Sequence, residues 1–178
     1  LKATETNNDT ALWARVIETR RLVWDSYLDG NKVQYAYDSL LKVIPFAIEK
    51  LGEEHSVLGN IYKNLGIISY HLGNYETSVL EHQQAKQILL KQTGISDTAL
   101  IYTNMEIAWA LMEINRNEEC QQLITESLAH LSKLKIHKPL LEAELYTQLA
   151  AVYKNQRKPE QSVQYYEKSI EIRSSLGQ

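Results

Sequence analysis

Cysteine, proline and glycine are all scarce in this chain of 178 residues. The single cysteine, Cys120, excludes an internal disulfide framework and suits a reducing compartment, although a periplasmic protein can look the same. With no targeting signal in the sequence, we expect a cytoplasmic protein. Three prolines and seven glycines argue against long linkers. No apolar run approaches the roughly 20 residues that span a bilayer, and the N-terminus has no signal-peptide core. Because the chain begins at Leu1, we expect a fragment of a larger protein.

The chain also lacks an excess of positive charge. Its formal net charge is -3, which gives no electrostatic reason to expect nucleic acid, because phosphate binding needs a basic face that releases counterions. We therefore expect no nucleic-acid partner. Five histidines are present, yet none forms an HExxH motif or pairs with a cysteine at metal-ligand spacing, and no glycine-rich phosphate loop follows a strand. We therefore expect no enzymatic activity, no metal and no cofactor. The partner classes that remain are proteins and peptides.

Apolar residues recur at spacings of three and four along the chain, and no stretch alternates strictly as a half-buried strand does. The pattern predicts an all-α protein. Eight helices are expected, near residues 10–29, 33–51, 56–72, 75–92, 97–114, 117–133, 139–156 and 159–176. Pro45 falls inside the second of them and should kink or split it, because proline removes one backbone hydrogen bond.

An internal period of 42 residues organises these helices. Ser78, Cys120 and Ser162 lie 42 residues apart in the same slot of a helix-turn-helix pattern, and Ala36 extends the series backwards. Small residues in one slot indicate close approach of two helices, so we interpret Cys120 as a packing residue and not as a reactive thiol. The period predicts a single domain of four repeats, approximately residues 10–51, 56–92, 97–133 and 139–176.

The segments "NLG" and "YHLGNYETS" with Ala85, and "LAAVY" with Ser162 to Ser169, resemble the tetratricopeptide repeat (TPR). The 42-residue period and "LGEEHSVLGNIYKNLG" are similar to the longer variety found in kinesin light chains. This resemblance implies a right-handed superhelical α-solenoid of about four repeats, whose first helices line a concave groove. It also places His82 where the family buries an aromatic side chain, so we expect His82 in the core or an interface.

By the same resemblance, the groove-facing positions form a candidate peptide-binding surface. Asn64 matches an asparagine that often bonds the ligand backbone in this family, a task that suits an amide because it both donates and accepts. The candidate residues are Arg21, Asn60, Lys63, Asn64, Ile67, Tyr70, Tyr102, Met105, Glu106, Trp109, Met112 and Gln148.

The leading hypothesis is a protein-interaction scaffold that binds a peptide or helix of a partner in this groove. Its aromatic and methionine residues suit an interface centre. The groove-facing positions as a whole hold more acidic than basic residues, which should select basic ligand residues. The acidic residues are Asp25, Asp29, Glu106, Glu113 and Glu144, and the basic ones are Arg21, Lys63 and Lys154. Two alternatives stay open. These side chains can instead pack between helices, as Trp109 beside Ala108 and Ala110 illustrates. The array can also be the sensor or regulatory part of a larger signalling enzyme or transcription regulator.

The last predicted helix carries apolar residues around more than one face, whereas a terminal repeat normally needs a polar outer face. Val163 and Ile170 are the clearest examples. We therefore expect further repeats, another domain or a second copy of the chain to cover this helix.

Overall fold

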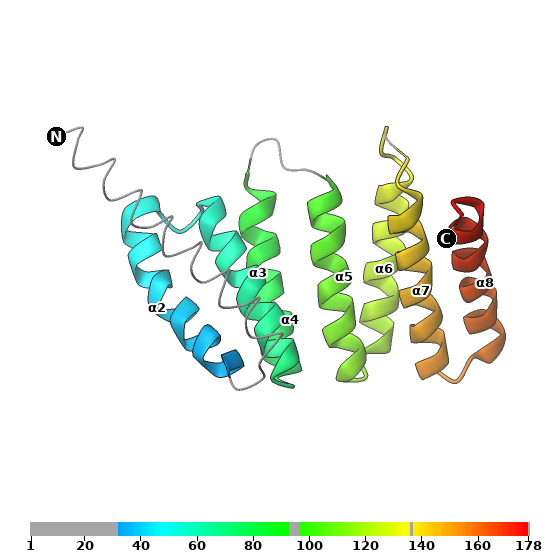
Figure 1. The fold of residues 1–178 in the computed structure, drawn as a ribbon, viewed down its shortest axis with the longest axis horizontal. Helices are drawn as coiled ribbons and strands as arrows, with labels where there is room; N and C mark the ends of the chain where they lie inside the picture. The colour runs from blue at the N-terminus through cyan, green and yellow to red at the C-terminus, as the bar shows by residue number, and fades with distance from the viewer. Residues whose placement is uncertain (1–31, 93–96, 136, 178) are drawn as a thin grey trace. The chain divides into compact units, whose positions relative to one another are not determined.

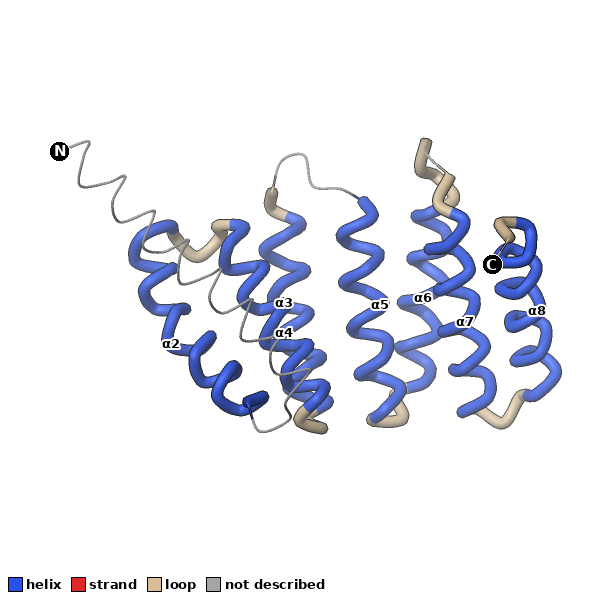
Figure 2. Tube along the Cα trace, viewed as in Figure 1, coloured by secondary structure: helices blue, strands red, loops and turns tan. Residues whose placement is uncertain are grey.

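The computed structural model describes residues 32–92, 97–135 and 137–177, and all regular structure in these ranges is helical (Figures 1 and 2). The predicted helix over residues 10–29 lies outside them. The other seven are confirmed, with ends within two residues of the prediction. They are α2 (Val33–Leu51), α3 (Ser56–His71), α4 (Tyr75–Leu90), α5 (Asp97–Glu113), α6 (Asn117–Leu131), α7 (Pro139–Asn155) and α8 (Pro159–Ser175).

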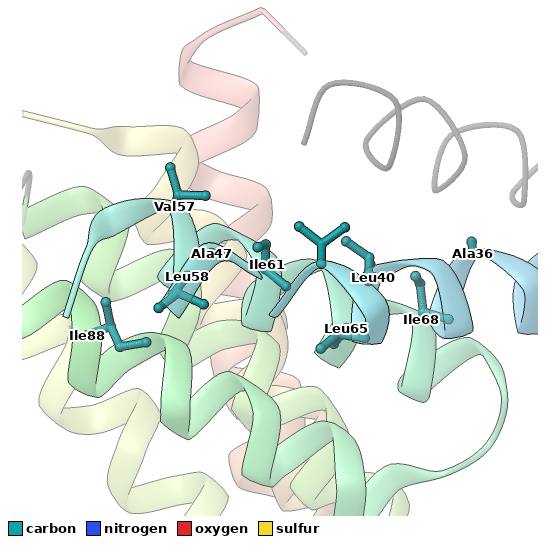
Figure 3. Close-up of a cluster of buried hydrophobic side chains, with 10 residues drawn as sticks. Ala36, Leu40, Ala47, Val57, Leu58, Ile61, Leu65, Ile68 and Ile88 are labelled. Carbon is teal, nitrogen blue, oxygen red and sulfur yellow. The ribbon is translucent and has the colours of Figure 1, made fainter. Parts of the chain in front are cut away.

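The chain divides into two compact units, residues 1–93 and 94–178. In the first unit, α3 and α4 form a helical hairpin and α2 packs against α3. The core of this unit is a cluster that includes Leu40, Leu58, Ile61 and Leu65, each at most 1% exposed (Figure 3). Burial of such side chains supplies most of the stabilising free energy, because single helices of this length have only marginal stability in water.

Helix α2 continues through Pro45, so the expectation that this proline splits the helix is wrong. Proline removes a single donor from the helix interior. Leu40, Val43 and Ala47 flank the proline, and all three are buried in the core of the first unit. Packing of these three side chains stabilises the helix on both sides of Pro45.

The second unit consists of two hairpins, α5 with α6 and α7 with α8, and the hairpins contact each other through α6 with α7 and α5 with α7. Residues with positive φ mark the tight turns inside the hairpins. Gly73 (φ 78°), Asn115 (φ 58°) and Arg157 (φ 58°) lie 42 residues apart, so each hairpin turns through one left-handed residue. None of the helices in the described ranges is long and apolar enough to cross a membrane.

The small residues that recur every 42 positions are all buried, and three of them also donate a hydrogen bond. The four residues are Ala36, Ser78, Cys120 and Ser162. Each bond runs from the second helix to a main-chain carbonyl of the first helix, 12 residues earlier in sequence. The bonds are Ser78 Oγ to Gly66 O (2.8 Å), Cys120 Sγ to Ala108 O (3.2 Å) and Ser162 Oγ to Ala150 O (2.9 Å). A small donor at this position fits between the helices and also bonds the carbonyl, whereas alanine can only fill the space.

Cys120 is fully buried, and burial raises the pKa of its thiol to about 12. The nucleophilic thiolate is therefore almost absent at pH 8. We expect native protein to leave Ellman's reagent unreacted over an hour at pH 8, and urea-unfolded protein to react completely. Rapid reaction of the native protein would contradict the packing role of Cys120.

Candidate binding surface

Two large aromatic side chains of α5 are exposed to solvent. Tyr102 is 45% exposed and Trp109 is 40% exposed. They lie seven residues apart, which places them two helical turns apart on one face. Packing therefore covers only part of Trp109, and a substantial part of its ring remains available to a ligand.

Carboxylates share this face of α5. Glu106 is half-buried and follows Tyr102 by four residues, and the exposed Glu113 follows Trp109 by four residues. On α7, the half-buried Glu144 occupies the position equivalent to Tyr102 one repeat later. We call Tyr102, Glu106, Trp109 and Glu113 the α5 face. It combines apolar rings with negative charge.

Three of the predicted surface residues are buried in the second unit instead. Met105 is 8% exposed, Met112 is 6% exposed and Gln148 is 1% exposed. Positions 105 and 112 lie one residue away from Glu106 and Glu113, a rotation of about 100° around the helix that turns them towards the core. The structure therefore removes Met105, Met112 and Gln148 from the ligand-facing set.

Gln148 has a structural role that its sequence position does not reveal. Its side-chain Nε2 donates to the backbone carbonyl of Met105 at 3.0 Å and so joins α7 to α5. Its Oε1 is buried and accepts no hydrogen bond from the described residues. The amide fixes the backbone of α5 beside Glu106, in the middle of the α5 face.

In the first unit, the predicted residues of α3 lie along that helix at spacings of three and four. Asn60 is exposed, whereas Lys63, Asn64 and Ile67 are half-buried. Tyr70 packs edge-on against Tyr75 of α4, with 5.3 Å between ring centroids, and is engaged within its own hairpin. Arg21 lies outside the described residues. The α3 residues and the α5 face belong to different units.

A tyrosine cluster in the second unit was missed by sequence reasoning. Tyr165 of α8 stacks on Tyr153 of α7, with centroids 5.3 Å apart and planes 4° apart, and also lies 5.9 Å from Tyr146. Lys168 Nζ sits 4.8 Å from the Tyr165 centroid, in cation–π range. Gln121 Nε2 of α6 donates to the Tyr153 hydroxyl at 3.3 Å. The seven-residue spacing of Tyr146 and Tyr153 was the available signal.

A second missed network joins the three helices of the first unit. The Glu81 carboxylate of α4 accepts hydrogen bonds from the Tyr37 hydroxyl of α2 at 2.8 Å and from Ser69 Oγ of α3 at 2.5 Å. Burial raises the pKa of Glu81, although both hydrogen bonds act in the opposite direction. Tyr37, Ser69 and Glu81 all belong to the first unit, so this network stabilises the packing of α2 on the hairpin of α3 and α4.

Comparison with known proteins shows which fold these helices form. Residues 143–176, which hold most of α7 and all of α8, match the model of the tetratricopeptide repeat. The crystal structure of BtubC from P. vanneervenii superposes with a TM-score of 0.77, covering 99% of this chain and 74% of that one, at 15% identity. The chain has the tetratricopeptide-repeat fold.

Two further structures with this fold extend the comparison. A Podospora anserina protein, described as a kinesin light chain with nearly identical TPR-like repeats, gives a TM-score of 0.75 at 17% identity, covering 93% of this chain and 76% of that one. MamA from Desulfovibrio magneticus gives 0.62 at 13% identity, covering 89% and 75%. No curated protein matches the sequence at a significant level. The predicted TPR resemblance and all-α solenoid class are confirmed.

Proposed function

We propose that this TPR chain is a protein-interaction scaffold whose α5 face holds a peptide or helix rich in apolar and basic residues. The observation that carries the proposal is the exposure of Tyr102 and Trp109 on one face of α5, with Glu106 and Glu113 on the same face. The repeat match at residues 143–176 supports a protein-interaction scaffold in general terms. The scaffold acts by binding and not by catalysis.

The two kinds of side chain on the α5 face contribute differently. Covering a large apolar side chain completely is worth about 1.5–3 kcal/mol, whereas an exposed ion pair is worth about 0–1 kcal/mol. The rings of Tyr102 and Trp109 therefore supply most of the affinity. Glu106 and Glu113 select among ligands, because carboxylates attract lysine and arginine and repel acidic segments.

Buried residues keep the α5 face in its binding shape. The hydrogen bond from Gln148 to the Met105 carbonyl fixes α5 against α7 before any ligand arrives. Met105 and Met112 anchor the adjoining side of α5 in the core. A face that is already ordered loses little conformational entropy on binding, which favours affinity.

The test is an affinity capture from cell extract with the wild type and with the Tyr102→Ala/Trp109→Ala variant as baits. We expect the variant to lose at least 90% of the specifically captured partner, because removing two covered rings costs about 3 kcal/mol or more. Purified partner is then titrated by calorimetry. Salt should weaken the interaction, since charge selects the ligand.

The matched control is Tyr35→Ala/Leu80→Ala, which removes two side chains that are 62% and 65% exposed in the first unit. This control should capture the same partners as the wild type. Circular dichroism verifies that all three baits are folded. Equal capture by the wild type and the Tyr102→Ala/Trp109→Ala variant would refute binding at the α5 face.

A further inference from the structure

Helix α8 exposes an apolar stripe on the side away from its own hairpin contacts. Val163 is 55% exposed, Tyr166 is 36% exposed and Ile170 is 61% exposed. Their spacings of three and four residues place them on one face of the helix. Within the described part of the second unit, no helix covers this stripe, although Ser162 and Ser169 on the adjoining side of α8 are buried.

The same face is an interface on α6, one repeat earlier. Gln121, Ile124 and Leu128 precede Val163, Tyr166 and Ile170 by 42 residues each. Ile124 is only 1% exposed. Gln121 bonds the Tyr153 hydroxyl of α7, and Leu128 lines a cavity of about 380 Å³ together with Tyr146 and Glu142 of α7. Helix α6 thus uses this face to bind the first helix of the next hairpin, and α8 repeats the face.

Charge distinguishes the face of α8 from that of α6. Glu160, Glu167 and Glu171 are exposed along one edge of the stripe, at spacings of seven and four. The corresponding α6 residues are Glu118, Thr125 and Ala129. Helix α8 therefore carries three carboxylates where α6 carries one, and the added negative charge requires a partner of opposite sign.

This acidic edge argues against pairing with a second copy of α8. In a symmetric antiparallel pair of helices, each edge faces the same edge of the copy. In a register centred near Glu167, that residue would lie opposite its counterpart, and Glu160 would approach Glu171 of the copy. Like charges placed opposite each other disfavour that association.

We propose that the Val163, Tyr166 and Ile170 face of α8 binds an amphipathic helix of a partner protein, whose apolar stripe is bordered on one edge by lysine or arginine. The partner helix occupies the position that α7 occupies on α6. Its apolar residues cover Tyr166 and its flanking residues, and its basic edge lies along Glu160, Glu167 and Glu171. This surface is separate from the α5 face, so the chain offers two docking sites.

The α6 and α7 interface supplies the probe. Synthetic peptides with the sequence of residues 138–156 carry the α7 stripe. Glu142 lines the cavity with Leu128, and Gln156 donates to Gln121. Leu128 and Gln121 are the counterparts of Ile170 and Val163, the stripe residues that adjoin the acidic edge of α8. The basic probe carries Glu142→Lys and Gln156→Lys. The acidic probe keeps Glu142 and carries Gln156→Glu. Both are labelled for fluorescence anisotropy.

We expect the full chain to bind the basic probe at least tenfold more tightly than the acidic probe at low salt, and the difference to shrink at high salt. Val163→Glu/Ile170→Glu should abolish binding, and Glu167→Lys/Glu171→Lys should reverse the preference. Leu80→Glu, at a residue 65% exposed in the first unit, is the control and should bind as the wild type does. The Tyr102→Ala/Trp109→Ala variant should also bind normally, which separates this test from that of the α5 face.

Three results would overturn the proposal. Equal affinity for the two probes would show that charge does not select the partner. If neither probe binds, the face of α8 is not a docking site for such a helix. Sedimentation that shows a wild-type dimer, dissolved by Val163→Glu/Ile170→Glu, would assign the face to a second copy of the chain. Circular dichroism of each variant verifies that lost binding does not reflect lost folding.

Discussion

Acidification from pH 7 to pH 4 is expected to cost the first unit about 3 kcal/mol through His82 alone. His82 is 1% exposed, and burial, aided by the positive charge of Lys63, lowers the pKa of its imidazole to about 4. The unfolded chain titrates near pH 6.5. Between these values only the unfolded state binds the proton, so stability is full above pH 6.5 and falls as the pH approaches 4.

Urea denaturation of the wild type and of His82→Ile at pH 7, 6, 5 and 4 measures this effect. Isoleucine is the apolar choice because Ile124 occupies the same position in the next hairpin. Burial raises the pKa of Glu81, so Glu81 acts in the opposite direction, but it is present in both proteins and cancels in the difference. The difference in unfolding free energy should change by about 3 kcal/mol across the range. Parallel pH profiles would contradict the assignment to His82.

Gly66→Ala is expected to destabilise the first unit by about 2 kcal/mol, although alanine favours a helix interior by about 1 kcal/mol. A Cβ atom at Gly66 would meet three atoms of the His82 ring at 2.6–2.8 Å, well inside ordinary contact. The ring is enclosed and cannot move without displacing other core atoms. Overpacking of this kind outweighs the gain in helix propensity.

A double substitution tests whether the ring is the cause. Ala108 pairs with Ile124 at the equivalent positions of the next hairpin, so Gly66→Ala/His82→Ile transfers a pair that the chain already contains. We expect it to recover most of the stability lost in Gly66→Ala, with a coupling energy of about 1–2 kcal/mol in a double-mutant cycle. Thermal denaturation at pH 7 provides the measurement. Additive effects of the two single changes would show that His82 does not limit the space at Gly66.

Helix positions followed from the sequence because each depends on local signals. Apolar spacing and left-handed turn residues such as Asn115 act within a few residues of the chain, so seven helices were predicted within two residues of their ends. Of the two outcomes expected at Pro45, a kink or a split, the split does not occur, because tertiary packing of α2 outweighs the loss of one hydrogen bond. Burial of His82 was also predicted correctly. Its close contact with Gly66 could not be predicted, because that contact depends on the distance between α3 and α4.

The candidate surface was only partly predictable. Tyr102 and Trp109 were placed on α5 by position in the repeat, and their exposure agrees with a surface role. Met105 and Met112 were assigned to the same surface because a mapped position does not fix the rotation of a helix to within one residue. The stack of Tyr153 on Tyr165 was missed, since it requires the relative placement of α7 and α8.

The hydrogen bond from each slot residue to a carbonyl 12 residues earlier has a consequence for how the chain folds. Its partners are close in sequence, so the entropy lost in bringing them together is small. Each hairpin can set its own register before its neighbours are present, and contacts of such low order favour rapid folding. Within the second unit, the hairpin of α5 and α6 can thus assemble first during synthesis and serve as the template on which the hairpin of α7 and α8 packs.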